Sequence, residues 1–320
     1  MINMKKTTIA SMALFLLLIA AAIFIIPQGI APNIIGPNYK NVTVWTHVNI
    51  THSRPEVLNV TIFETFNTSA TSITVAAGAT KRITCNATIR SWDGFNDIVY
   101  VNATLWHWST SNHSAIDNNN SHYTNASCFI NNTIANTSGF IGYYECNFDV
   151  YYYANNGTWA CNVTALNSWN YNGSGYNTTT FYPVYALNVT NGIDYGNVAV
   201  YAYSNETVAN VTNFGNMAIN LSVEGYGTKR GDGLAMNCST NGNISVANER
   251  FSLSSTGNNG AAWSVKTPLN SSQDLVANLT MPKQTIPGSQ IINSTYWQLY
   301  IPPNPAGNCT GWIVFTAMAP

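Results

Sequence analysis

The feature of this chain that most constrains its fold is a repeated Asn-x-Ser/Thr triplet whose middle residue is often apolar. Twenty-five of the 45 asparagines among the 320 residues begin such a triplet. Successive side chains of a β-strand point to opposite faces, so a triplet on a strand turns its Asn and Ser/Thr outward and its middle residue inward. The triplets therefore predict half-buried strands. Eight asparagines show the pattern plainly: Asn41, Asn59, Asn86, Asn102, Asn162, Asn210, Asn220 and Asn278.

The same triplets are acceptor signals for N-linked sugar, which predicts a heavily glycosylated chain outside the cell. A strand protein with an Asn- and Thr-rich surface would also generate triplets by composition alone, so this alternative stays open. Charged residues are only 8% of the chain, against about a quarter in an ordinary soluble domain, and the net charge is −1. Without a basic surface, nucleic-acid binding is excluded.

The N-terminus carries a hydrophobic targeting element. Lys5 and Lys6 precede an almost continuous apolar run over residues 7–26, which Pro27 ends. The two lysines favour a cytoplasmic N-terminus and export of everything that follows. Residues 1–26 are thus either an uncleaved membrane anchor, held through residues 7–26, or a cleaved signal peptide. A linker rich in Pro and Gly follows over residues 27–39, and the first strand is expected near Lys40.

Six cysteines in an exported chain predict three disulfides. Cys85 and Cys161 each lie on the apolar face of their own strand, so both point inward. This predicts a disulfide between two facing sheets. The neighbouring pair Cys128 and Cys146 would then staple a local hairpin, and Cys238 would pair with Cys309 in the second half. The sequence contains no Cys-x-x-Cys spacing, which a common type of zinc site would require.

Alternating apolar runs recur about every ten residues, which is typical of β-sandwiches. The chain is long enough for two, and we expect an all-β fold with an N-terminal hydrophobic helix and tandem immunoglobulin-like sandwiches over residues 40–183 and 184–320. Within the first, Val99, Val101, Ala103 and Leu105 would form the inward face of one strand. Within the second, two alternating runs over residues 208–223, joined by Asn-Phe-Gly-Asn, predict a hairpin.

Two resemblances follow from particular segments. The first half resembles an immunoglobulin-like sandwich at Arg82-Ile-Thr-Cys-Asn-Ala-Thr and Gly157-Thr-Trp-Ala-Cys-Asn-Val-Thr, with Trp159 where that fold places its tyrosine-corner residue. Residues 85–105 also look like extracellular β-domains of archaeal surface proteins. The second half, through residues 208–223, 296–303 and 310–317, is similar to camelysin-like and archaeal bundling-pilin sandwiches. These resemblances imply a component of an archaeal-type cell envelope or filament.

Two kinds of candidate site stand out. Trp106 and Trp108 would share the outward face of their strand, where they could stack on sugar rings or on a partner protein, or be covered by a loop or by the chain's own glycan. Asp93 and Asp97 in one loop, and Asp117 in another, offer carboxylates to a structural Ca²⁺, or else form polar turns. No other cofactor is expected.

The sequence thus predicts an exported, heavily N-glycosylated cell-surface protein with a structural or adhesive role and no enzymatic activity. One alternative is a module that binds carbohydrate or a partner through exposed Trp106 and Trp108. Another is a subunit of an extracellular fibre or pilus assembled by strand exchange. Expected partners are the membrane, other surface proteins or glycans, and further copies of this chain.

Overall fold

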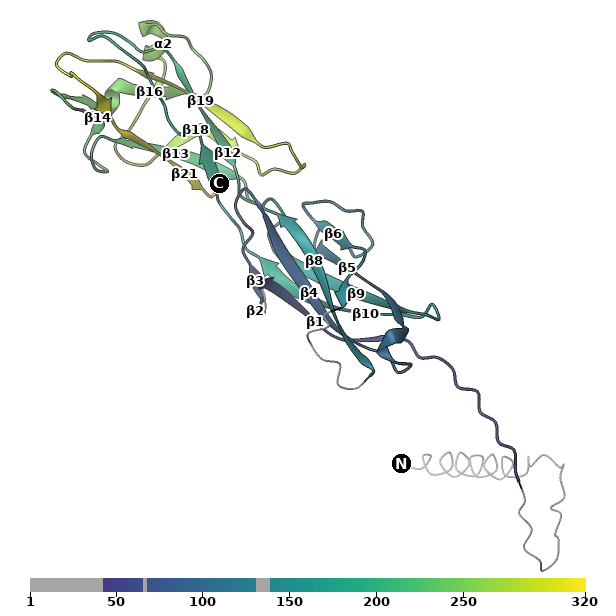
Figure 1. Ribbon diagram of the computed structural model, residues 1–320. Coiled ribbons are helices and arrows are strands. Elements are labelled where there is room, and N and C mark those ends of the chain that lie inside the picture. Colours follow the sequence, from purple (N-terminus) through teal and green to yellow (C-terminus); the bar gives the residue numbers. More distant parts are fainter. Residues whose placement is uncertain (1–42, 66–67, 131–138) are drawn as a thin grey trace, which may run out of the picture. The chain divides into compact units, whose positions relative to one another are not determined.

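The computed structural model describes residues 43–65, 68–130 and 139–320, and these residues are nearly all strands, turns and extended connections (Figure 1). The chain divides into two units after Ile50, and of the first unit only residues 43–50 are described. The targeting segment over residues 1–26, the linker and Asn41 lie outside the described residues. Among the residues that are described, no helix is long and apolar enough to cross a membrane.

Ten strands between residues 56 and 181 form two facing five-stranded sheets with the orders β2-β1-β4-β8-β7 and β3-β10-β9-β5-β6. A shared apolar core fills the space between them. The strands are β1 (Glu56–Thr65), β2 (Thr68–Ser69), β3 (Ser72–Ile73), β4 (Thr80–Arg90), β5 (Ile98–His107), β6 (His122–Asn125), β7 (Phe129–Ile130), β8 (Ile141–Tyr151), β9 (Gly157–Asn167) and β10 (Asn172–Phe181), with a short 3-10 turn, η1 (Phe95–Asp97), before β5.

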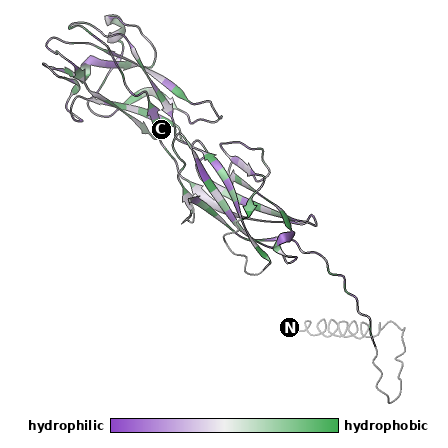
Figure 2. Ribbon diagram, viewed as in Figure 1, coloured by the Kyte–Doolittle hydropathy of each residue, from purple (hydrophilic) through white to green (hydrophobic). Residues whose placement is uncertain are grey.

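The inward position predicted for the middle residue of the triplets is confirmed, whereas the outward position predicted for Ser/Thr fails at Thr212 and Ser222, which are both buried. In Figure 2 hydrophobic and hydrophilic residues alternate along the strands. The middle residue of every one of the eight triplets that falls among the described residues is buried in a core. These residues are Val60, Ala87, Ala103, Val163, Val211, Leu221 and Leu279. The same triplets therefore specify both the inward residues of the strands and the acceptor signals for N-linked sugar.

Three disulfides join the cysteine pairs that the sequence predicts. Cys85 on β4 bonds to Cys161 on β9 across the two sheets, with Cα atoms 6.6 Å apart and a sequence separation of 76 residues. Closing a loop of that length is worth roughly 4 kcal/mol in the chain-entropy model. Cys128 and Cys146 join the β7–β8 pair, so both bonds pass through one core.

Trp159 replaces the tyrosine of the immunoglobulin corner and keeps its function. Its side chain is fully buried at the start of β9, two residues before Cys161. The indole Nε1 donates a 2.7 Å hydrogen bond to the backbone carbonyl of Asn155, four residues upstream. An indole N–H thus satisfies the corner carbonyl that a phenolic hydroxyl satisfies in that fold.

One inward residue was predicted wrongly. Val101, Ala103 and Leu105 are buried as expected, but Val99 is 60% exposed. The pairing of β5 with β9 shifts register between Ile98 and Tyr100. A bulge inserts an extra residue and moves every side chain before it to the other face, which alternation alone does not reveal.

The strands after residue 186 form three further sheets: β11-β12-β19-β16-β17, β18-β13-β21 and β15-β14-β20. Two apolar clusters lie between them. The elements are β11 (Leu187–Val189), β12 (Thr207–Asn213), β13 (Ile219–Tyr226), β14 (Leu234–Cys238), β15 (Asn243–Ser245), η2 (Val246–Asn248), β16 (Glu249–Ser252), α2 (Gly260–Ser264), β17 (Thr267–Pro268), β18 (Asp274–Met281), β19 (Ile292–Leu299), β20 (Cys309–Thr310) and β21 (Trp312–Met318).

The hairpin predicted over residues 208–223 is wrong. Its two strands, β12 and β13, belong to different sheets, so the connection between them is a corner. The buried side chain of Asn213 accounts for this: its Nδ2 donates to the carbonyls of Met217, Met281 and Pro282 at 2.9–3.2 Å, and its Oδ1 accepts from the Gly215 amide. These backbone groups bond to the Asn213 side chain, whereas in a hairpin the backbone groups of the two strands would bond to each other.

The first strand also begins later than predicted. Residues 43–55 are in no strand, and β1 starts at Glu56, directly after Pro55. The segment alternates like a strand but has no described partner strand, and a strand needs a partner for its backbone groups. No sheet crosses residues 182–186. The domain boundary near residue 184 stays a prediction, because residues 51–320 cluster as one unit.

Candidate functional site

Two surface features could support function: an aromatic pocket on the sheet of β5, β9 and β10, and a groove beside β20 and β21. The pocket has a volume of about 430 Å³. Its lining is neutral, apart from one histidine, and comes from three strands and the loop after β5. The lining residues are Trp106, Trp108, His113, Asn162, Thr164, Asn172, Ser174 and Tyr176.

Trp106 and Trp108 meet in this pocket but differ in exposure. Their rings stack with centroids 6.3 Å apart, and the Trp108 ring lies 6.2 Å from that of Tyr176. Trp108 is 53% exposed, whereas Trp106 is only 9% exposed because Trp108 and the edge-on ring of His113 lie against it. Trp106 is therefore largely covered, and Trp108 and Tyr176 form the accessible aromatic surface.

The acceptor triplets of neighbouring strands lie against one another. On β5 and β9, Thr104 is directly opposite Asn162 and Asn102 is directly opposite Thr164. The same arrangement recurs in the facing sheet, where triplets starting at Asn59 and Asn86 pair antiparallel. Antiparallel pairing places each Asn beside the hydroxyl of the other triplet, so the outer faces carry paired acceptor signals.

The loop aspartates are occupied by hydrogen bonds within the protein. Asp93 accepts from the Ser53 amide at 2.9 Å, Asp97 from the Ser168 hydroxyl, and Asp117 from both His122 and Thr124. In the described part of the chain, no group of three His, Cys, Asp or Glu residues could hold a metal ion. A structural Ca²⁺ at these loops stays a prediction.

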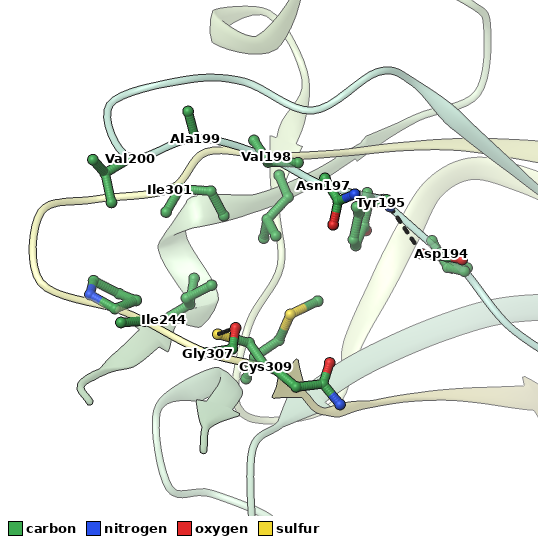
Figure 3. A pocket seen from close by; sticks show the side chains of 17 residues that line it. Asp194, Tyr195, Asn197, Val198, Ala199, Val200, Ile244, Ile301, Gly307 and Cys309 are labelled. Atoms are coloured by element: carbon green, nitrogen blue, oxygen red, sulfur yellow. Dashed lines mark hydrogen bonds between the residues drawn. The ribbon is translucent and has the colours of Figure 1, made fainter. Parts of the chain in front are cut away.

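The groove consists of two cavities of about 860 and 510 Å³ that share Ile193, Tyr195 and Met236. One wall is the irregular segment of residues 189–200. The opposite wall is residues 305–309 beside the first cavity and residues 311–315 beside the second. Figure 3 shows residues 198–200 and Ile301 across the first cavity from Ile244, Gly307 and Cys309. The lining mixes apolar side chains with polar groups, among them Asn197 and Asn308 in the first cavity and Thr190 and Asn191 in the second.

The strand wall of this groove pairs on one side only. β21 is the last strand of its three-stranded sheet and pairs with β13, while β20 is last in its own sheet and pairs with β14 through two residues. Cys238 and Cys309 are cross-strand partners there and are joined by the third disulfide. The inward residues Ile313 and Phe315 pack against the core but are only partly buried. An edge strand with half-covered inward side chains leaves space for one more strand.

A buried acid lies in the groove wall. Glu249, 1% exposed, accepts a 2.6 Å hydrogen bond from the Tyr195 hydroxyl. Burial raises the pKa of Glu249 to about 7, against the lowering effect of that hydrogen bond, and burial also raises the pKa of Tyr195. The sequence prediction missed both residues. Alternation over β16 was the available signal, since Glu249 shares its inward face with Phe251.

Neither a known family profile nor a curated protein matches this chain in sequence. Among solved structures, the chain is similar to a chain of a chaperone–tip adhesion subunit complex of Csu pili from Acinetobacter baumannii, with 10% identity and a TM-score of 0.35 over 77% of this chain and 96% of that one. A chaperone–tip adhesin complex of CFA/I fimbriae biogenesis gives 11% identity and 0.31 over 87% and 88%. A C-terminal domain of a Streptococcus agalactiae AgI/II polypeptide gives 12% and 0.23 over 82% and 100%. At these TM-scores the likenesses carry no argument about function.

Proposed function

We propose that this protein is an exported, glycosylated structural protein of the cell surface whose copies join by strand donation. In this proposal, residues 42–51 of one copy enter the groove beside β20 and β21 of a neighbouring copy and add a strand to the free edge of β21. The observation that carries it is that, among the described residues, one strand-like segment and one strand edge of the same chain both lack a partner strand.

The donor segment has the pattern of a strand and lacks a partner. Val44, Val48 and Ile50 are spaced two or four residues apart, and all three are 74–84% exposed. Exposed apolar side chains at a period of two are unusual unless another surface covers them. Ten residues of extended chain span about 33 Å. The groove wall over residues 305–315 contains β20 and residues 312–315 of β21.

The acceptor supplies what the donor needs. The side of β21 away from β13 offers backbone amides and carbonyls, and the apolar lining residues Ile193, Ile313 and Phe315 would receive the even-numbered side chains of the donor. β-Augmentation draws its affinity from such main-chain bonds and its specificity from pockets for alternate side chains. The carbohydrate-binding alternative required exposure of both Trp106 and Trp108, and only Trp108 meets that requirement.

The test is a pair of double variants that do not alter any acceptor triplet. V44D/V48D places two carboxylates on the face that would be buried, and W45D/H47D places two on the opposite face. We expect wild type and W45D/H47D to form high-mass assemblies by light scattering and electron microscopy, and V44D/V48D to remain monomeric. A synthetic peptide of residues 42–51 should slow the amide exchange of β21. Monomeric wild type with no peptide-induced protection of β21 would exclude the proposal.

A further inference from the structure

The aromatic pocket is lined by acceptor asparagines as well as by aromatic rings. Asn162 and Asn172, from different strands, both begin triplets and both line it. Asn162 lies between Thr104 on β5 and Tyr176 on β10, each directly opposite in register. A sugar attached to Asn162 would therefore leave the sheet between the exposed ring of Tyr176 and the Trp106–Trp108 stack.

The Asn162 side chain is oriented within its own triplet. Its Nδ2 donates a 3.2 Å hydrogen bond to the Oγ1 of Thr164, and on the facing sheet Asn59 makes the same bond to Thr61 at 3.1 Å. The hydroxyl of the triplet thus holds the amide nitrogen that glycosylation modifies. Thr104 Oγ1, beside Asn162 in register, is buried without a hydrogen-bond partner. Thr104 itself does not line the pocket, so the candidate site consists of Asn162, Thr164 and the aromatic rings beside them.

The arrangement is repeated on the other sheet, which makes coincidence a poor account of it. A cavity of about 180 Å³ there is lined by residues of two paired triplets and by neighbouring aromatic and acidic side chains. The lining residues are Asn59, Thr61, Phe63, Asn86, Ala87, Thr88, Tyr143, Tyr144 and Glu145. Asn86 Oδ1 in this cavity is also buried without a hydrogen-bond partner. On each sheet, therefore, a cavity is lined by residues of two acceptor triplets from neighbouring strands and by a tyrosine ring.

We propose that Asn162 carries an N-linked glycan whose first sugar packs against Trp108 and Tyr176, so that the chain's own sugar fills the aromatic pocket. In the transfer step, the Asn162 amide nitrogen bonds to C1 of the sugar while the bond from C1 to the phosphate of a lipid-linked donor breaks. The lipid phosphate leaves with the electron pair and the amide loses a proton. The apolar face of a pyranose ring buries the aromatic surface, and the neutral lining suits an uncharged sugar.

The experiment combines peptide-level mass spectrometry with hydroxyl-radical footprinting of the full chain purified from its native envelope. T164V removes the acceptor triplet but keeps Asn162, and T178V makes the same change at an exposed position on β10 without removing a triplet. We expect glycan on Asn162 in wild type and T178V, and none in T164V. Oxidation of Trp108 and Tyr176 should rise several-fold in T164V and stay at the wild-type level in T178V.

Two results would overturn the inference. One is a bare Asn162 in wild type; if an added oligosaccharide then protects Trp108, the pocket is a site for foreign carbohydrate instead. The other is a glycan on Asn162 whose loss leaves the oxidation of Trp108 and Tyr176 unchanged. If T164V fails to fold by circular dichroism, N162Q removes the same glycan while keeping Thr164. Neither result depends on whether copies of the chain join by strand donation.

Discussion

The hydroxyl of Tyr195 donates a 2.6 Å hydrogen bond to the carboxyl of Glu249 inside the wall of the groove beside β20 and β21. Burial disfavours the charged form of each group, and for Glu249 it outweighs the hydrogen bond, which favours the carboxylate. The protonation of one carboxyl therefore couples groove stability to pH.

Stability should fall as pH rises from about 4.5 to about 7. The folded-state pKa of Glu249, about 7, lies above the ordinary value of 4.5, so the folded state binds the proton more tightly than the unfolded state. The contribution is complete below pH 4.5 and is lost by pH 7, at a cost on the order of 3 kcal/mol. Denaturant unfolding across this pH range would measure it. E249Q keeps an acceptor for Tyr195 and should remove that part of the slope; an unchanged slope would contradict the assignment.

Gly311, which separates β20 from β21, should not tolerate a side chain. A Cβ there would lie 1.7 Å from the carbonyl oxygen of Ala235, a backbone atom that moves only with its strand. We expect G311A to lower the free energy of unfolding by about 2 kcal/mol or more. The control is Gly192 in the opposite wall of the groove, where a Cβ meets nothing within 4 Å, so G192A should stay within about 0.5 kcal/mol of wild type. Equal effects of the two substitutions would argue against the observed packing at Gly311.

Replacing Trp159 with Phe should destabilise the first sandwich. The substitution removes the indole N–H that satisfies the Asn155 carbonyl and leaves space beside Phe181, whose ring stacks on Trp159 at 4.8 Å. A buried carbonyl left without its donor costs about 1–3 kcal/mol. Thermal and denaturant unfolding would measure the loss. W108F, at a half-exposed position outside the core, provides the matched control and should change stability little.

Removing the disulfide between Cys238 and Cys309 should weaken both stability and strand acceptance. The bond closes a loop of 71 residues, worth roughly 4 kcal/mol in the chain-entropy model. It also holds β20, which pairs with β14 through two residues only. We expect C238A/C309A to unfold at lower denaturant concentration and to bind the peptide of residues 42–51 more weakly. If C238A/C309A bound the peptide with wild-type affinity, the proposed acceptor site would not include β20.

The strand character of this chain could be predicted from the sequence because alternation is a local property. Triplets such as Asn86-Ala-Thr88 put the apolar residue in the core wherever the strand lies, so burial of Ala87 needs no knowledge of partners. The disulfide pairs could also be predicted, since an inward cysteine on each of two strands leaves few ways to pair.

Tertiary structure alone decided which strand meets which. The bulge that exposes Val99 depends on the register of β5 against β9, and the corner at Asn213 depends on carbonyls from residues 281 and 282. Residues 43–50 alternate as well as any strand of the protein, yet they are in none, because pairing requires a neighbour that the sequence pattern does not specify. The aromatic pocket and the groove arise in the same way, from residues far apart in the chain. Alternation depends only on residues next to one another in the chain and can be read from the sequence. A site made by several strands depends on the register in which those strands pair.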